Sequence, residues 1–373
     1  MADVTSGTAD DAVDVALRRA FADEWSHVVA TLIRLTGDWA LAEDCAQEAF
    51  ARAAVRWPHD GVPLRPGAWL TTVARNEAHD RLRRRATERR RMRDVALVEE
   101  RAAAEHVVTG GEDVPDDRLR LVFTCAHPAL PLDARVALTL RTVAGLTVPE
   151  IARAFGVGEA AMAKRLVRAR QKITHARIPY RVPQRDQLPA RLGGVLAVVY
   201  LVFTEGYSAS AGDSPVRAEL CAEAVRLARL LTELLPHEPE VHALVALELL
   251  HDARRPARLD ADGELVPLDA QDRALWDRAT AEDGVRALRT AQRLARGDSP
   301  YLLQAEIAAC HSTSSSAAST DWRTVVHLYD RLLAIAPTPH AALARAVALG
   351  SAGEPARGLA ALRTLLADDG AAA

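Results

Sequence analysis

Residues 159–173 carry the clearest helical periodicity in the chain. Apolar side chains recur there at intervals of four, three and four residues, at Met162, Leu166, Ala169 and Ile173. This spacing puts all four on one face of an α-helix. A shorter helix is predicted just before it, because Thr147 and Glu150 have the three-residue spacing of a capping box. The glycines at positions 156 and 158 favour a turn between the two helices.

The remaining faces of the predicted second helix are basic, since they carry Lys164, Arg165, Arg168 and Lys172. Two short helices joined by a glycine turn, with positive charge on the second, are typical of a helix-turn-helix that reads DNA. The alternative is an ordinary helical hairpin with a solvated basic face. We favour DNA binding because the positive charge lies where the motif requires it.

The rest of the chain also has helical patterns, which are separated by breaks rich in proline and glycine. Helices are expected within 13–55, 68–105, 116–178 and 190–366. The breaks fall at 57–67, 109–115 and 179–189. Aromatic residues make up only 4% of the chain, and alanine, leucine, arginine and valine dominate, which favours helix over sheet. An all-α protein with two or three domains is expected from 373 residues.

Two segments in the last third, 234–258 and 335–357, suggest an internal repeat. In each segment, two prolines precede a helical pattern and a Pro-Ala-Arg sequence follows it. The prolines are three residues apart in the first segment and two in the second. Helix pairs closed by proline turns are typical of tetratricopeptide-like solenoids. We therefore predict a tetratricopeptide-like helical domain here.

The positive charge of the chain is concentrated in two segments, although the formal net charge is −3. Residues 75–93 hold nine arginines against three acidic residues, and residues 132–178 hold nine basic residues against three acidic ones, a net +6 in each. Two basic segments in an otherwise acidic protein indicate two separate contacts with a polyanion. The preference for arginine over lysine is also what a GC-rich genome produces.

The cysteine pattern favours a reducing, cytoplasmic environment. Cys45, Cys125, Cys221 and Cys310 are far apart and form no CxxC pair, so we expect buried thiols. Cys125 and His127 are potential metal ligands, but no second pair accompanies them, and neither a metal nor another cofactor is expected. The longest apolar run, 192–203, is too short to cross a bilayer and is predicted to be a buried helix.

Residues 130–173 resemble region 4 of the extracytoplasmic-function (ECF) sigma factors of the sigma-70 family. The resemblance lies in Gly-Leu-Thr at 145–147, Glu-Ile-Ala at 150–152 and Arg-Leu-Val-Arg-Ala-Arg at 165–170. It implies that Lys164, Arg165 and Arg168 contact the −35 promoter element. The family often has Gly-Thr-Val-Lys-Ser at the start of this helix, whereas residues 160–164 read Ala-Ala-Met-Ala-Lys.

Residues 42–50 are similar to the region 2 helix that docks on the β′ clamp of RNA polymerase. Asp44, Gln47 and Glu48 share one predicted exposed face, while Leu41, Cys45, Ala49 and Phe50 turn inward. The alternative for the exposed residues is a solvated acidic surface without a partner. The resemblance implies that these three residues bind the polymerase core.

The segments 69–76 and 80–85 resemble the −10 recognition helix of the same family. The residues implied to bind −10 promoter DNA are Arg75, Asn76, Asp80, Arg83 and Arg84. Arginine suits this role because it pairs with phosphates and stacks on bases. The loop at 57–67 falls where such factors capture an extruded base. Trp69 is more simply interpreted as a core residue than as a base contact.

The resemblance continues at 116–130, 202–207, 249–254, 271–273 and 320–322, where it matches a subgroup that bears a C-terminal tetratricopeptide-like domain. The domain organisation expected is as follows: a disordered tail at 1–12, region 2 at 13–108, a linker at 109–131, region 4 at 132–178, a proline-rich connector at 179–189 and the regulatory helical domain at 190–373.

Taken together, the chain is expected to be an alternative sigma factor that binds core RNA polymerase and promoter DNA in the cytoplasm. Its C-terminal domain is expected to modulate that activity through a small regulatory protein or an intramolecular contact, without a membrane partner. Two other functions compete with this one. A repressor with a ligand-sensing domain needs only one DNA-binding unit. An enzyme would need a site, and Glu205, His251, Asp252, Asp272 and Arg273 offer no nucleophile, metal or phosphate motif, so no catalytic residue is expected.

Overall fold

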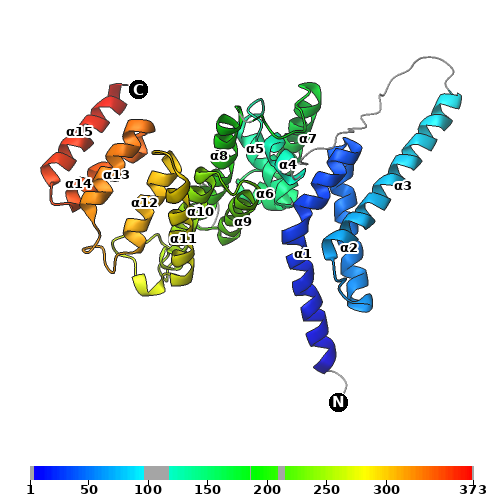
Figure 1. Ribbon diagram of the computed structural model, residues 1–373, viewed down its shortest axis with the longest axis horizontal. Coiled ribbons are helices and arrows are strands. Elements are labelled where there is room, and N and C mark those ends of the chain that lie inside the picture. The colour runs from blue at the N-terminus through cyan, green and yellow to red at the C-terminus, as the bar shows by residue number, and fades with distance from the viewer. Residues whose placement is uncertain (1–3, 96–116, 185, 209–214, 372–373) are drawn as a thin grey trace. The chain divides into compact units, whose positions relative to one another are not determined.

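The computed structural model describes residues 4–95, 117–184, 186–208 and 215–371, which are drawn as ribbons in Figure 1. These residues form helices and short loops, and the one β-type pairing among them is an isolated bridge between Leu259 and Leu265. The predicted all-α fold is confirmed. The chain divides into an N-terminal unit, residues 1–152 and 157–195, and a C-terminal unit, residues 153–156 and 196–373. Each unit is described by itself.

Three long helices begin the N-terminal unit: α1 (Val4–Thr36), α2 (Trp39–Asp60) and α3 (Pro66–Val95). Asp38 caps α2, because its carboxylate accepts a hydrogen bond from the amide of Leu41 at 3.0 Å. The three helices pack against one another, and a cluster of Phe21, Trp25 and Phe50 joins α1 to α2.

Two helices in this part extend beyond the ranges that the sequence predicted. The disordered tail predicted at 1–12 is helical from Val4, because a helix that has formed extends at the gain of one hydrogen bond per residue. Residues 1–3 lie outside the described part. The predicted break at 57–67 is shorter, since α2 continues through Pro58 to Asp60. The chain then turns at Gly61, whose φ of 82° suits glycine.

The second half of the N-terminal unit consists of short helices. They are α4 (Asp117–Cys125), α5 (Leu132–Leu138), the π-helical segment η1 (Thr139–Val143), α6 (Val148–Ala154) and α7 (Glu159–His175). Helix α4 lies within the segment predicted to be a linker, 109–131, and it buries Leu121, Val122 and Phe123. Residues 109–116 lie outside the described part.

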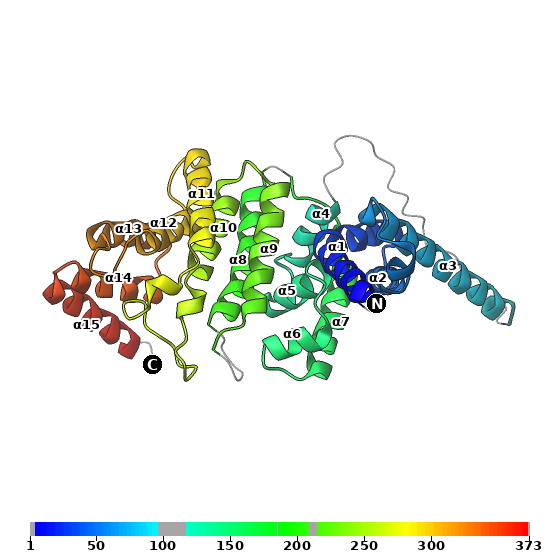
Figure 2. The same ribbon diagram turned by 90° about the horizontal axis from the view of Figure 1, so that it is seen from below.

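The C-terminal unit is a succession of helices that follow one another from α9 to α15 in both views of the ribbon (Figures 1 and 2). Helix α8 (Leu188–Tyr207) leads into it. The others are α9 (Ala218–Leu234), α10 (Pro239–Asp252), α11 (Arg278–Leu294), α12 (Pro300–Ser312), α13 (Trp322–Ile335), α14 (Pro339–Ser351) and α15 (Pro355–Ala371), with two short 3₁₀ helices, η2 (Arg255–Ala257) and η3 (Arg273–Leu275).

The helices before the two proline segments end with similar backbone angles. The residues that cap the C-terminal ends of α9 and α13 are Leu235 (φ −134°, ψ 60°) and Ala336 (φ −143°, ψ 71°), and Pro239 and Pro339 begin the helices that follow. Proline suits the first helical turn because its missing N–H has no helical partner there. The corners differ afterwards, since the first is one residue longer and the N-cap residues Glu238 (φ −92°, ψ 110°) and Thr338 (φ −137°, ψ 147°) have different backbone angles.

Helix α8 is long and apolar enough to cross a membrane by length and composition, and 39% of its most apolar stretch is buried. This helix is longer than the apolar run at 192–203, which by itself is too short for a span. Val202 and Phe203 are almost completely buried, as expected of a core helix. Core helices often have this composition, so length and composition alone do not indicate a membrane span.

Candidate functional site

The acidic face of α2 has the exposure that the sequence predicted. Asp44 and Gln47 are exposed and Glu48 is half-buried, whereas the residues predicted to turn inward are all buried: Leu41, Cys45, Ala49 and Phe50. Along a helix, positions separated by three and four residues lie together. The three polar side chains therefore form one surface patch on α2.

Ion pairs with α3 shape this acidic face. Glu48 accepts a hydrogen bond from Arg52 at 2.9 Å, and Arg81 lies 3.7 Å from Asp44. Both arginines have shorter contacts with Glu77, at 2.5 Å and 2.9 Å, and hydrogen bonds from Arg81 and then Arg52 lower the pKa of Glu77. Both arginines therefore pair mainly with Glu77 rather than with Asp44 and Glu48. Three carboxylates against two guanidiniums leave the face acidic.

Helix α3 presents a second exposed face, which is basic. Asn76, Asp80 and Arg83 are separated by four and three residues and therefore share one side of the helix. Arg75, Arg83 and Arg84 are exposed. Arg83 donates to Asp80 at 2.5 Å, and this bond lowers the pKa of the Asp80 carboxyl group.

The roles of Asp80 and Trp69 follow from these contacts. Asp80 is half-buried and holds the Arg83 guanidinium through this bond. Trp69 is half-buried and packs edge-on against the buried Trp57, with ring centroids 5.8 Å apart. This packing agrees with a core role for Trp69.

The two halves of the predicted helix-turn-helix begin as the sequence indicated. The Thr147 amide and hydroxyl donate to Glu150 Oε2 at 2.6 Å and 2.7 Å, and the Glu150 amide donates to Thr147 Oγ1 at 3.4 Å. This is the expected capping box. In the turn, Gly156 has a φ of 58°, while Gly158 caps α7 with an ordinary φ of −67°.

Helix α7 buries the apolar face that its periodicity predicted, at Met162, Leu166, Ala169 and Ile173. Lys164 and Arg168 are exposed, whereas Arg165 is half-buried and lies 3.3 Å from Asp133. These three basic side chains line a hollow of about 760 Å³ between α7 and the start of α5. A positively charged hollow beside an exposed helix is suited to a nucleic-acid backbone.

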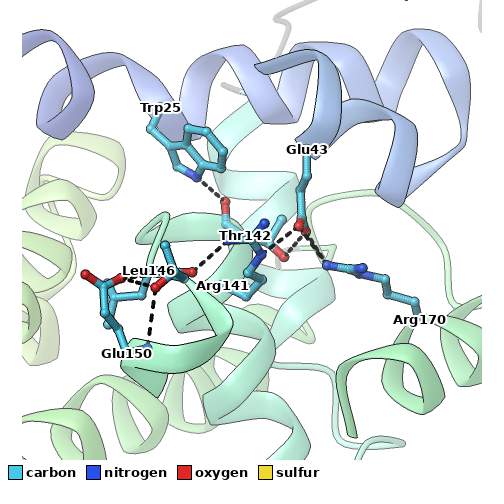
Figure 3. Close-up of polar contacts among 8 residues, drawn as sticks. Trp25, Glu43, Arg141, Thr142, Leu146, Glu150 and Arg170 are labelled. Atoms are coloured by element: carbon cyan, nitrogen blue, oxygen red, sulfur yellow. Dashed lines mark hydrogen bonds and ion pairs between the residues drawn. The ribbon is translucent and has the colours of Figure 1, made fainter. Parts of the chain in front are cut away.

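A buried carboxylate joins the two halves of the N-terminal unit. Glu43 on α2 is only 2% exposed, and Figure 3 shows it facing η1 and α7. Arg170 donates to both of its oxygens at 2.7 Å, Arg141 donates to Oε2 at 2.9 Å, and Thr142 donates to Oε1 at 3.0 Å. Burial of a charge is costly unless partners compensate it, and here two guanidiniums and a hydroxyl do so.

Neighbouring contacts reinforce this junction (Figure 3). The Trp25 indole N–H donates to the carbonyl oxygen of Thr142 at 3.1 Å, and Arg141 also donates to the carbonyl oxygen of Leu146 at 2.9 Å. Gly145 closes the segment with a φ of 82°, and a Cβ there would come within 2.7 Å of the Phe21 ring. Glycine is therefore required at this position both for its backbone conformation and for space.

Polar contacts also join α4 to α1 and to the segment that follows α7. Asp117 on α4 accepts hydrogen bonds from Arg34 at 2.7 Å and from Arg120 at 2.8 Å. The Tyr180 hydroxyl donates toward the carbonyl oxygens of Ala30, at 3.1 Å, and Asp117, at 3.3 Å. Burial raises the pKa of Tyr180, so this phenol remains a donor at neutral pH.

The sequence analysis did not single out Glu43, Arg141 and Arg170, which form this junction. A signal was present, because Glu43 shares a helix face with Ala46 and Phe50, and a carboxylate on an apolar face needs buried partners. The partners themselves lie 98 and 127 residues further along the chain, and only the tertiary structure identifies them.

Residues considered for an enzyme site make structural contacts in the C-terminal unit. Glu205 lies 3.3 Å from Arg217, Asp252 accepts from Arg255 at 2.8 Å, and Asp272 caps η3. Arg273 donates to two backbone carbonyl oxygens, while His251 lies 2.6 Å from an Arg254 nitrogen.

The cysteine residues are all free thiols. Cys45, Cys125 and Cys221 are buried as predicted, and Cys310 is partly buried. Burial raises the pKa of the Cys45 thiol to about 11 and that of Cys221 to about 12. His127 Nδ1, close to Cys125 in sequence, accepts a hydrogen bond from the amide of Ala129 at 3.1 Å.

Comparison with known proteins matches the family model of sigma-70 region 2 to residues 20–88 and that of sigma-70 region 4 to residues 120–173. An uncharacterized protein of Rhizobium meliloti, R00370, is 41% identical over 341 residues, which cover 91% of this chain and 80% of that protein. The ECF RNA polymerase sigma factor SigL of Mycobacterium tuberculosis is 34% identical over 164 residues, which cover 42% of this chain and 85% of SigL. The chain belongs to the ECF sigma factors.

As an ECF sigma factor, the protein is an alternative sigma factor that directs transcription initiation with RNA polymerase at promoter DNA. This family is a class of regulatory proteins rather than enzymes. The probable ECF sigma factor SigI of Mycobacterium tuberculosis is 32% identical over 155 residues, 41% of this chain and 52% of SigI. A family of unknown function, DUF6596, matches residues 191–292. No solved structure matches the chain.

Proposed function

We propose that three surfaces of the N-terminal unit divide the work of this sigma factor. The α2 patch of Asp44, Gln47 and Glu48 binds the β′ clamp of the polymerase core. The basic face of α3, with Arg75, Asn76, Arg83 and Arg84, contacts −10 promoter DNA, and Asp80 positions Arg83. The exposed part of α7, with Lys164, Arg165 and Arg168, contacts the −35 element.

The observation that carries this proposal is the separation of opposite charges on exposed faces. The α2 patch stays acidic because Glu77 takes the closest bonds of Arg52 and Arg81. The α3 and α7 faces expose guanidinium and ammonium groups. Exposed basic side chains bind DNA phosphates, which supply most of the non-specific affinity. An acidic patch is unsuited to DNA, so it is left for a protein partner.

Action on RNA polymerase implies that the protein works in the cytoplasm.

The arrangement of the N-terminal unit represents a closed state. Arg85 on α3 pairs with Asp38 at 2.9 Å, and Arg170 on α7 pairs with Glu43 at 2.7 Å. These two ion pairs and the rise of α2 and α7 between them limit how far apart the two basic faces can be. The Cα atoms of Arg84 and Lys164 lie about 50 Å apart at most. The −10 and −35 elements are centred about 25 base pairs apart, roughly 85 Å of B-DNA. Binding both elements at once therefore requires the Glu43 junction to open.

The C-terminal helical domain controls this sigma activity in our proposal, through a small regulatory protein or through contact with the sigma regions. Support comes from its repeated proline corners, since stacked helix pairs form extended binding surfaces. We assign the domain to residues 190–373 and the connector to 179–189, as the sequence predicted.

Replacing both Arg83 and Arg84 with alanine is expected to weaken promoter opening about 10- to 100-fold, because two charge-assisted phosphate contacts are lost. The slope of log affinity against log salt concentration should fall by about 2, at roughly 0.9 per phosphate. Filter binding and permanganate footprinting of holoenzyme across a salt series measure both effects. The matched control replaces Arg18 and Arg19, which are exposed on α1. Equal opening by the α3 variant and this control would remove Arg83 and Arg84 from the interface.

A further inference from the structure

The C-terminal unit contains a hollow whose inner end is lined by a buried arginine. Helices α8, α10, α12, α13 and α14 surround it, and its volume is about 350 Å³. Five of its lining residues, Leu268, His311, Tyr329, His340 and Ala344, also line a neighbouring hollow of about 460 Å³. The two hollows are therefore adjacent, with these five residues between them. Their size is in the range of small-molecule sites.

Arg254 lies at the inner end and is only 5% exposed. One of its terminal nitrogens is 2.6 Å from His251 Nδ1, whereas its Nε is buried without a hydrogen-bond partner among the described residues. Within the described part of the chain, no carboxylate forms an ion pair with Arg254. A buried guanidinium without a counter-charge is costly, so this position is suited to an incoming anion.

The Tyr207 side chain is a further hydrogen-bond partner of Arg254, but it is not a carboxylate, and the other charged groups around Arg254 add positive charge. Arg273 lines the neighbouring 460 Å³ hollow, called the outer hollow below. It stacks on Trp276, with its guanidinium carbon 4.5 Å from the ring centre. Among the described residues that line either hollow, the one carboxylate is Asp269, which is exposed. Glu248 on α10 lines neither hollow, and burial raises the pKa of its carboxyl group well above the usual range.

The outer hollow offers apolar surface next to this charge. Trp322, Val325 and Tyr329 of α13 face Leu343 and Val347 of α14 across it. Leu343 and Val347 are 47% and 57% exposed, which is unusual for large apolar side chains in a hollow. A ligand that fits both parts has an anionic group at one end and an apolar body at the other.

We propose that the C-terminal domain binds a small organic acid, with its carboxylate on Arg254 and its apolar body between α13 and α14. A planar guanidinium binds a carboxylate through paired hydrogen bonds, which Nε and a terminal nitrogen of Arg254 can donate. The ligand would couple to transcription only if the proposed control by this domain holds. Binding itself is measured without polymerase, so the two ideas fail separately.

Calorimetric titration of the full chain tests this site with three acids, 4-phenylbutyrate, indole-3-propionate and decanoate, and with the neutral amide of each. A peptide carboxylate offers the same chemistry, so a capped apolar tripeptide acid and its amide form a further arm. We expect saturable binding of at least one acid, binding of its amide at least tenfold weaker, and a loss of at least tenfold in Arg254→Met.

A second pair of variants keeps the test decisive if Arg254→Met does not fold. Ala344 lines both hollows and Ala342 lines neither, although both are half-buried on α14. Ala344→Phe is expected to block ligand binding by filling the space where the two hollows meet, while Ala342→Phe leaves ligand binding intact. The proposal is overturned if no acid binds, if the amides bind as tightly as the acids, or if Ala344→Phe binds as the unchanged protein does.

Discussion

Reversing the charge of the α2 patch, with Asp44→Lys and Glu48→Lys together, is expected to abolish co-purification with core RNA polymerase. Two attractive contacts become repulsive, and like charges placed opposite each other at an interface cost several kcal/mol. The measurement is a pull-down of core polymerase by the tagged full chain, followed by titration of holoenzyme assembly.

Thermal unfolding should change little in this double variant. The ion pairs lost are exposed contacts with Arg52 and Arg81, which are worth about 0–1 kcal/mol each. The matched control reverses Asp14 and Asp23, which are exposed on α1 and carry the same charge. If the α2 variant still forms holoenzyme at wild-type affinity, Asp44 and Glu48 are only a solvated face.

Removing the negative charge of Glu43, with Glu43→Gln, is expected to destabilise the junction within the N-terminal unit by about 3 kcal/mol. The substitution leaves Arg141 and Arg170 partly buried without a carboxylate, and breaking a buried ion pair in this way is costly. A free-energy change of this size makes local opening about 100-fold more frequent.

Hydrogen exchange of the full chain detects that opening. Amides of η1 and α7 should exchange faster in Glu43→Gln, while those of α10 and α12 in the C-terminal unit stay unchanged. Glu48→Gln, in the same helix but with an exposed partner, serves as the control and should have little effect. Unchanged protection of η1 and α7 would mean that Glu43 does not hold the junction closed.

The sequence predicted those parts of the fold that depend on local periodicity and local capping. The apolar face of α7, the Thr147–Glu150 capping box and the acidic face of α2 all rest on residues within one or two helical turns. Such patterns survive in the tertiary structure because the same side chains that favour the helix also determine which face is buried.

The parts that could not be predicted depend on distant partners. Glu43 lies beside the predicted docking residues, yet its burial is explained only by Arg141, Thr142 and Arg170. Arg254 is one of 45 arginines in the sequence, and its isolation in a hollow follows from the packing of five helices. Helix ends also differ from the predicted ones, since α1 begins at Val4 and α2 continues past Pro58.

The central claim is that this chain directs promoter-specific initiation and that its C-terminal domain controls the activity. In vitro transcription of genomic DNA by core polymerase, with 5′-end mapping, tests it most directly. Core alone, core with the full chain and core with the chain truncated after Arg181 are compared, after circular dichroism shows that the truncated chain is folded. We expect the full chain to add a discrete set of start sites and the truncation to change their yield severalfold. Start sites identical to those of core alone, or equal yields from the two chains, would contradict the account.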